Sequence, residues 1–247
     1  MSVIDRVGFR KGRAAAPVTG AEDCRWSAIS SAVDLVPPPP MDLVHRLLEA
    51  GRWAADHRLE ALEERCTGED RRWVEAWPGE HYRLLAALTA TVRPEVVVEV
   101  GTFQGHGSLA LLQGQDEARV VTYDIIPWQN IPGSVLAAED FAGNRFEQRI
   151  GDLADPAYLE TQLATLRQAD LIFVDGPKDG VWEPLFVERV LPELTDRRRL
   201  VVFDDIRLLE MVQLWRDLPY PRIDATSLGH WSGTGMLWTD PAHIDVR

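Results

Sequence analysis

The chain has 247 residues, 45% hydrophobic and 26% charged, proportions that are typical of a soluble globular protein. Its 26 lysines and arginines are outnumbered by 39 acidic residues, and the net charge of −13 disfavours nucleic acid as a main partner. Two cysteines, Cys24 and Cys66, are too few for a disulfide scaffold, and no apolar run reaches membrane-spanning length.

The N-terminal part of the chain is expected to lie outside the main domain. Residues 1–40 lack clean periodicity and end in four prolines, which favours a partly extended or disordered arm. The N-terminus has no continuous apolar core of the secretory type, so we expect a cytoplasmic protein. Apolar residues at helical spacing from 41 to 74 predict two amphipathic helices. We therefore divide the chain into an arm (1–40), a helical extension (41–78) and a main domain (79–247).

The main domain alternates short β-branched runs with helical patterns, which predicts strand–helix units around a parallel sheet. Strands are expected at 96–100, 119–124, 146–150, 171–175 and 200–204, followed by a closing hairpin of 222–227 and 235–239. Helices are expected at 81–92, from about 106, at 187–194 and at 208–216. The predicted fold class is α/β, with a seven-stranded, mostly parallel sheet, helices on both faces and an antiparallel C-terminal hairpin strand.

Acidic residues stand at the ends of four predicted strands. They are Glu99, Asp124, Asp175 and the pair Asp204 and Asp205. Ligands of open α/β sheets bind beyond the carboxyl ends of the strands, so this repetition indicates a site. Aspartate is also a common helix N-cap, and this is the alternative explanation for any one of them.

The loop after the first strand reads Glu99-Val-Gly101-Thr-Phe103-Gln-Gly105-His-Gly-Ser. Its glycine spacing differs from the G-x-G-x-x-G of nicotinamide dinucleotide folds. An acid two residues before the first glycine suits a cofactor with a cationic or zwitterionic end better than a pyrophosphate. Asp124, after the next strand, is placed to accept both hydroxyls of a ribose.

This loop resembles that of the class I S-adenosylmethionine-dependent methyltransferases, which reads acid-x-Gly-x-x-x-Gly, and the resemblance extends over about residues 79–240. It implies a Rossmann-like sheet, a methionine end of the cofactor near the loop, the ribose at Asp124, and the adenine amino group near Asp152. A helix N-cap before Pro156 is the alternative role of Asp152. The cofactor-binding residues that we expect are Glu99, Gly101, Phe103, Gly105, Asp124, Asp152 and Asp175.

Three of the acidic residues follow neighbouring strands. The ends of adjacent parallel strands lie about 5 Å apart, so Asp175, Asp204 and Asp205 are expected to converge. Carboxylates of like sign gather only where something neutralises them. A hard dication such as Mg²⁺ takes oxygen ligands and keeps several waters, which leaves room for a substrate oxygen.

The pattern resembles the metal-dependent, catechol O-methyltransferase-like branch of the class, with Asp-x-x-Lys after the fourth strand and Asp-Asn or Asp-Asp after the fifth. A Phe141-Ala142-Gly143 run before the third strand also matches. The resemblance implies that Asp175, Asp204 and Asp205 bind Mg²⁺ or another divalent cation and that Lys178 is the general base. Asp205 stands in place of the commoner Asn, which adds negative charge and leaves the substrate open.

The chemistry of methyl transfer to a hydroxyl fits this assignment. A metal lowers the pKa of a coordinated hydroxyl and of a nearby lysine, whereas an arginine cannot accept the proton. The chain has only two lysines, Lys11 and Lys178. The acceptor is expected to be a small vicinal diol, on an aromatic ring or a sugar, and the Arg- and Ala-rich composition hints at natural-product tailoring.

Five aromatic residues are candidates for the acceptor pocket: His81, Trp128, Trp182, His230 and Trp231. Ordinary packing is the alternative for each. A metal-independent methyltransferase, with His81 or His230 as base and Asp204 and Asp205 capping a helix, is the second hypothesis. An inactive cofactor-binding partner subunit is the third, and a homodimer is left open. We expect neither a nucleic-acid nor a membrane partner.

Overall fold

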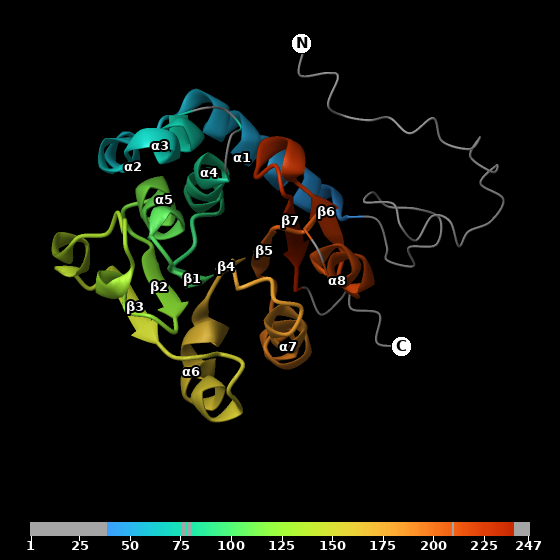
Figure 1. Cartoon of the computed structure of the whole chain (residues 1–247). Coiled ribbons are helices and arrows are strands. Elements are labelled where there is room, and N and C mark those ends of the chain that lie inside the picture. The colour runs from blue at the N-terminus through green and yellow to red at the C-terminus, as the bar shows by residue number, and fades with distance from the viewer. Residues whose placement is uncertain (1–38, 76–77, 79–80, 209, 240–247) are drawn as a thin grey trace, which may run out of the picture. The chain divides into compact units, whose positions relative to one another are not determined.

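The computed structural model describes residues 39–75, 78, 81–208 and 210–239 (Figure 1). The described residues all belong to one compact unit, 36–247. The expected N-terminal arm falls almost wholly outside the described residues. In the described part, no helix is long and apolar enough to cross a membrane.

Seven strands form one sheet in the order β3-β2-β1-β4-β5-β7-β6. The first five run parallel, and β7 runs antiparallel to both β5 and β6. This confirms the predicted α/β class and its antiparallel closing strand. The strands are β1 (Val96–Val100), β2 (Arg119–Asp124), β3 (Phe146–Ile150), β4 (Leu171–Val174), β5 (Leu200–Asp204), β6 (Arg222–Asp224) and β7 (Thr234–Trp238).

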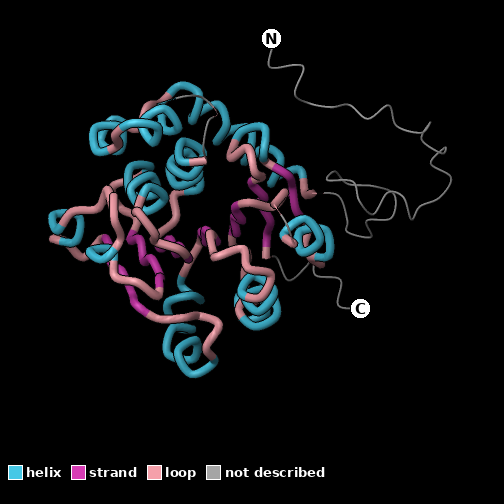
Figure 2. Tube along the Cα trace, in the orientation of Figure 1, coloured by secondary structure: helices cyan, strands magenta, loops and turns pink. Residues whose placement is uncertain are grey.

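Helices cover both faces of the sheet (Figure 2). One face carries α1 (Met41–Asp56), α4 (Tyr82–Val92) and α5 (His106–Gly114), with α2 (Glu60–Arg65) and α3 (Gly68–Glu75) beyond them. The other carries α6 (Pro156–Gln168), α7 (Trp182–Arg189) and α8 (Met211–Asp217). Short 3₁₀ turns are η3 (Trp128–Asn130), η4 (Ala138–Phe141), η5 (Leu191–Leu194) and η6 (Thr226–Leu228).

The predicted helices differ from the structure in three segments. The segment 41–74 forms three helices instead of two, because the chain leaves helical geometry at 57–59 and 66–67. The helix expected at 187–194 is α7, which begins at Trp182 because Asp179 Oδ1 accepts hydrogen bonds from the backbone N–H groups of Val181 and Trp182. Pro192, which lacks an N–H, lies in the separate turn η5. The helix expected at 208–216 is α8, which begins at Met211.

Alternate residues of each strand enter two separate hydrophobic cores. In β4, Leu171 and Phe173 pack on the face of α4 and α5, whereas Ile172 and Val174 pack on the face of α6 and α7. This period of two is what a strand buried on both faces requires. The helical extension joins the first core through Leu43, which is fully buried with α4. The sheet is thereby held rigidly, and its strand ends are fixed in space.

The strand order reverses between β1 and β4, which pair directly. β2 and β3 extend the sheet to one side of this point, and β5, β7 and β6 extend it to the other. Ligands of doubly wound sheets bind beyond the strand ends at such a reversal. The loops that follow β1, β2, β4 and β5 therefore bound the candidate site.

Candidate active site

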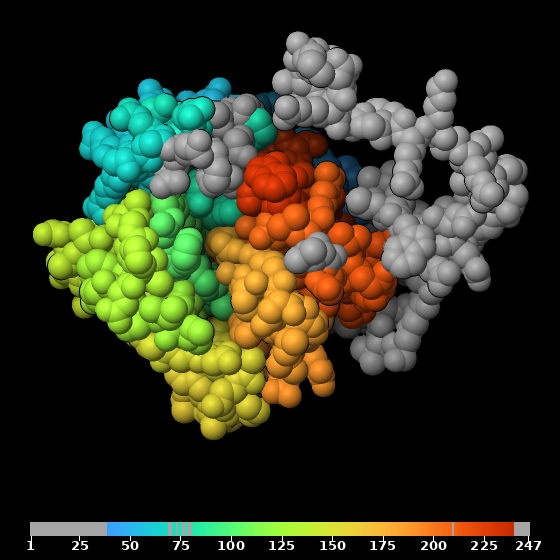
Figure 3. Space-filling view, in the orientation of Figure 1, coloured from blue at the N-terminus to red at the C-terminus, as the bar shows by residue number. Residues whose placement is uncertain are grey.

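A cavity of about 570 Å³ lies at the carboxyl ends of β1, β2 and β4. It is bounded by the loops after β1, β2, β3 and β4 and by the start of α7. In the space-filling view, the green surface of the loops near residues 100–135 faces the orange surface near 175–190 (Figure 3). The lining residues are Val100, Gly101, Phe103, Tyr123, Asp124, Ile125, Ile126, Gly151, Asp152, Leu153, Asp175, Gly176, Pro177, Asp179 and Trp182.

The glycines of the first loop are required by backbone geometry. Gly101 has a φ of 98°, and a Cβ there would lie 2.0 Å from the carbonyl oxygen of Asp175. Gly105 has a φ of 90°, and a Cβ would lie 2.3 Å from Leu136. Glycine alone adopts this conformation freely and permits such close approach. The loop can therefore run tightly against the end of β4 and shape one wall of the cavity.

Asp124 organises the same wall. Its Oδ2 accepts a hydrogen bond from the Phe103 N–H at 2.9 Å, and its Oδ1 accepts one from the Ile126 N–H at 2.9 Å. Each carboxylate oxygen keeps a further lone pair for a ligand hydroxyl. The exposed side chains of Phe103, Ile125 and Ile126 add an apolar rim.

Glu99 lies beneath the loop and does not line the cavity. Its side chain is buried and accepts a hydrogen bond from Ser108 Oγ at the start of α5. Burial raises the pKa of Glu99 to about 8. Hydrogen bonds from Ser108 and Thr122 favour the charged form and oppose this shift, but burial outweighs them. The structure thus places Glu99 as a support of the loop, and a direct contact with a cofactor stays a prediction.

Asp152 and Trp182 meet at the far end of the cavity. The Trp182 indole N–H donates to Asp152 Oδ1 at 3.0 Å, and the Ala154 N–H donates to the same oxygen. The N-cap of α6 is Asp155, which accepts from the Ala157 N–H, so Asp152 does not cap this helix. Trp182, which we expected near an acceptor, belongs to the cavity with the predicted cofactor residues.

The three predicted metal ligands converge. Asp175 follows β4, Asp204 ends β5 and Asp205 comes next, and one oxygen of each lies within 4.8 Å of the others. Pairing of β4 with β5 brings the two strand ends together. Because α8 begins at Met211 with Glu210 at its N-cap, neither Asp204 nor Asp205 caps it. Asp175 also lines the cavity, so the two parts of the site share one side chain.

Lys178 reaches into this group of carboxylates. Its Nζ forms an ion pair with Asp175 Oδ1 and lies 3.3 Å from Asp205 Oδ2. Burial opposes the charged form, but the carboxylates of Asp175, Asp204 and Asp205 outweigh it and raise the pKa of Lys178. Without another cation, Lys178 is therefore an ammonium that partly neutralises the carboxylates.

Backbone strain gathers at the same place. Among the described residues, four other than glycine have positive φ, and three of them are Phe103 (42°), Lys178 (53°) and Asp205 (60°). Such conformations persist where the surrounding structure over-determines them, typically at functional sites. The strained backbone helps to aim these side chains at the site.

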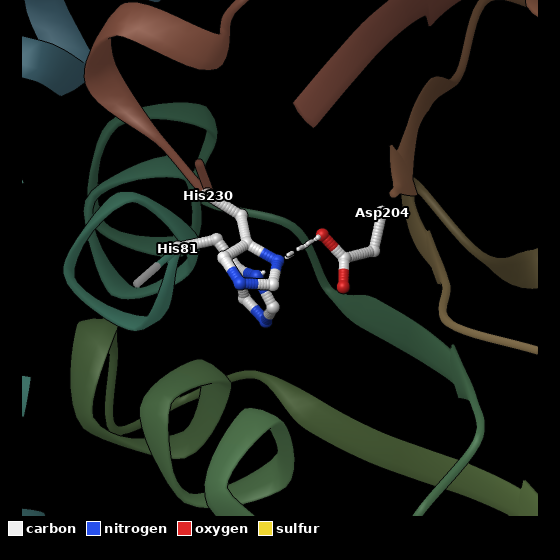
Figure 4. A group of neighbouring side chains, drawn as sticks. All are labelled: His81, Asp204 and His230. Carbon is white, nitrogen blue, oxygen red and sulfur yellow. Dashed lines mark hydrogen bonds and ion pairs between the residues drawn. The ribbon is translucent and has the colours of Figure 1, made fainter. Parts of the chain in front are cut away.

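Two histidines contact the carboxylate of Asp204 (Figure 4). His81 precedes α4 and His230 follows η6, and the Nδ1 atom of each lies 3.2 Å from Asp204 Oδ1. Burial lowers the pKa of His81, but the charges of Asp204 and Asp175 outweigh burial, so that this pKa is raised. The imidazoles in turn lower the pKa of Asp204 well below its usual range, although burial acts in the opposite direction.

The remaining acceptor candidates differ. Trp231 is 70% exposed and packs edge-on against His230. Trp128 stacks on Phe141 over the first core and does not line the cavity, which is a packing role. Phe141, from the Phe-Ala-Gly run, also stacks on Phe146. The sequence did not single out the apolar lining residues Ile125, Ile126 and Leu153 or the serine Ser232, whose Oγ donates to Asp205 Oδ1. No spacing signal marks them, since they belong to different loops.

Comparison with known proteins gives one family match and several structural likenesses. Residues 98–206 match a family model described as a methyltransferase domain. No curated protein matches the sequence significantly. The chain is similar in structure to the O-methyltransferase TomG of Streptomyces achromogenes, with 19% identity, a TM-score of 0.45, and coverage of 64% of this chain and 77% of TomG.

Two further solved structures align with more of the chain. Cofactor-bound Rv0187 from MTB has 18% identity and a TM-score of 0.47, over 82% of this chain and 97% of that one. The methyltransferase PaMTH1 of Podospora anserina, solved with S-adenosylhomocysteine, has 15% identity and a TM-score of 0.44, over 82% of this chain and 89% of that one.

Proposed function

We propose that the protein is an S-adenosylmethionine-dependent O-methyltransferase, because residues 98–206 match a methyltransferase-domain model and the sheet has the predicted α/β architecture. The acceptor is a small diol, such as a catechol or a sugar, and a divalent cation assists the transfer. The observation that carries the proposal is the position of Asp175, which lines the cavity and also belongs to the group of three carboxylates.

The cavity suits the proposed cofactor. The loop at Gly101 would hold the methionine end, Asp124 the ribose hydroxyls, and Asp152 with Trp182 the adenine. The rim formed by Ile125 and Ile126 offers apolar surface to the base. This orientation would place the methionine end beside Asp175, because Gly101 lies against the Asp175 carbonyl.

The carboxylates of Asp175, Asp204 and Asp205 fit a divalent cation. They are buried or half-buried, their oxygens are hard ligands, and Mg²⁺ is the ion expected from carboxylates alone. Their mutual repulsion is relieved only in part by Lys178. When bound, the ion lowers the pKa of a coordinated acceptor hydroxyl and so makes it a better nucleophile.

Lys178 is the proposed general base. Its Nζ is held as an ammonium by the carboxylates, while burial favours the neutral amine. A cation held by those carboxylates would withdraw this stabilisation and make the neutral amine of Lys178 accessible. When bound, S-adenosylmethionine would supply the methyl group to the acceptor oxygen and leave as S-adenosylhomocysteine, and Lys178 Nζ would take the hydroxyl proton.

A metal-independent transfer is the second candidate function. It is favoured by the contact between His230 Nδ1 and Asp204 Oδ1, because a carboxylate beside an imidazole supports a general base. This hypothesis also assigned a helix-capping role to Asp204 and Asp205. That role is wrong, because α8 begins at Met211 with Glu210 at its N-cap.

Calorimetric titration of S-adenosylhomocysteine, in Mg²⁺ and in chelator, tests the proposal. We expect cofactor binding in both conditions and Mg²⁺ binding that is lost in Asp204→Ala. Turnover of catechols and sugars that persists in chelator would favour the histidine-based reaction. Absence of cofactor binding would contradict the methyltransferase proposal itself.

A further inference from the structure

His81 and His230 approach Asp204 from two distant segments of the chain. Figure 4 shows both imidazole rings on one side of the Asp204 carboxylate. Their Nδ1 atoms each lie 3.2 Å from the same oxygen, Oδ1. The side chains of His81 and Asp204 are both only 4% exposed, and that of His230 is 14% exposed. Three groups that bind metals readily are thus enclosed in one small space.

The His81 ring has an unused polar atom at this point. Its Nδ1 is buried and has no hydrogen-bond partner among the described residues, although it is close to Asp204 Oδ1. The approach to that oxygen lacks hydrogen-bond geometry, and buried polar atoms are normally satisfied. An unsatisfied nitrogen, directed at a carboxylate and a second imidazole, is the expected state of a ligand atom without its ion.

The spacing of the three atoms agrees with a coordination sphere. Metal–nitrogen and metal–oxygen bonds of about 2.0–2.2 Å place neighbouring ligand atoms roughly 3.0–3.5 Å apart. Both histidine–carboxylate distances are 3.2 Å, and the ligand atoms of the three residues all lie within 4.8 Å of one another. Little movement is needed to bind one ion.

Lys178 contacts the two other carboxylates of the site. Its Nζ pairs with Asp175 and Asp205, whereas Asp204 Oδ1 is directed to the histidines. Ser232 Oγ lies 2.7 Å from His230 Nδ1 and donates to Asp205, so it also orients the ring. Asp204 Oδ1 therefore faces the two imidazoles while Lys178 Nζ is engaged by Asp175 and Asp205.

We propose that His81, His230 and Asp204 bind a divalent transition-metal ion of the Zn²⁺, Fe²⁺ or Co²⁺ type in preference to Mg²⁺. This inference rests on the proposed function, which places an ion beside the acceptor. It replaces Mg²⁺ as the preferred ion. Imidazole nitrogen suits these ions, whereas Mg²⁺ favours oxygen ligands and keeps its waters. Two histidines and a carboxylate leave coordination positions for Asp205, water or an acceptor oxygen.

The test measures metal binding by the full chain after treatment with chelator, without any turnover assay. Zn²⁺, Co²⁺ and Mg²⁺ are titrated separately by calorimetry, and the visible absorption of bound Co²⁺ reports nitrogen ligation. The variants are His81→Gln and His230→Gln, with His45→Gln on the exposed surface of α1 as the matched control. Thermal unfolding and S-adenosylhomocysteine binding show whether each variant is folded.

We expect wild type and His45→Gln to bind one Zn²⁺ or Co²⁺ more tightly than Mg²⁺. Loss of an outer-shell partner typically lowers metal affinity by roughly 10–100-fold, and loss of a ligand should cost at least as much. Each histidine variant should therefore bind Zn²⁺ at least that much more weakly, and the Co²⁺ spectrum should change. Mg²⁺ affinity should change little.

Two results would overturn the inference. If Mg²⁺ binds as tightly as Zn²⁺ and the folded histidine variants bind Zn²⁺ like wild type, the carboxylates alone hold the ion, and the proposed function stands. If S-adenosylhomocysteine binds but no divalent ion does, both the inference and the metal-dependent mechanism fail. Loss of cofactor binding in wild type would instead remove the proposed function.

Discussion

The two halves of the site are built differently. The cavity beside β1, β2 and β3 is mostly apolar and open at its rim, with Asp124 and Asp152 already bonded to neighbouring groups. Beyond β4 and β5, ionisable side chains from several segments crowd together, largely buried. The first half has the character of a preformed binding surface. The second holds carboxylates that Lys178 neutralises only in part.

The largest effect is expected from Asp204→Ala, which removes the carboxylate shared by both groups of ligands. His81 and Lys178 would lose a buried counter-charge, at a cost of about 3–5 kcal/mol in the free energy of unfolding. Metal binding and turnover should disappear together. Chemical unfolding and metal titration measure this, with Asp116→Ala as a fully exposed control. Unchanged metal affinity would refute the proposed ligand role of Asp204.

Lys178→Arg separates charge from base chemistry in the second half. Arginine keeps the positive charge near Asp175 and Asp205 but cannot accept a proton. Turnover should fall by about 10²–10⁴-fold, the usual contribution of a general base. Affinity for S-adenosylhomocysteine, measured by calorimetry, should stay within a few-fold. Retained turnover would exclude lysine as the base and direct attention to the histidines.

Glu99→Gln tests the support beneath the first half. The folded pKa of Glu99, about 8, lies above its ordinary value of 4.5, so between these values the folded state holds a proton that the unfolded state has released. The stability of wild type should therefore fall by a few kcal/mol as the pH rises from about 4.5 to 8. The variant lacks this contribution.

Urea unfolding at pH 5 and pH 9 checks the Glu99 prediction. The free energy of unfolding should fall more for wild type than for Glu99→Gln between pH 5 and pH 9. Parallel pH profiles for the two proteins would mean that Glu99 is ionised when folded.

The smallest effect is expected from Trp182→Phe, at the far end of the cavity. The change removes the indole hydrogen bond to Asp152 but keeps an aromatic ring against Phe186. Affinity for S-adenosylhomocysteine should weaken several-fold, in keeping with about 1 kcal/mol for one hydrogen bond. Trp128→Phe, outside the cavity, is the matched control. Equal affinities for the two variants would argue against adenine at Asp152.

Prediction from sequence was most successful where the signal is local. The strand at 96–100, the glycine loop and Asp124 follow one another in the chain, and pairing of consecutive strands brings them together. Helix boundaries were less accurate, because the start of α7 depends on the hydrogen bonds that Asp179 accepts and its end on Pro192. The alternative cap role for Asp152 was wrong because Asp155, three residues later, caps α6.

Spacing and residue type by themselves determined the α/β class, the glycine loop and the three carboxylates at adjacent strand ends, since each depends on periodicity or strand order. Only the tertiary structure decided that His81 and His230 both contact Asp204 and that Lys178 lies between Asp175 and Asp205. The contact of His81 with Asp204 joins segments more than a hundred residues apart, and those of His230 and Lys178 depend on how separate loops fold back. Sequence periodicity carries no information about how such loops meet. The same packing placed Trp182 with the cavity and Trp128 over the core.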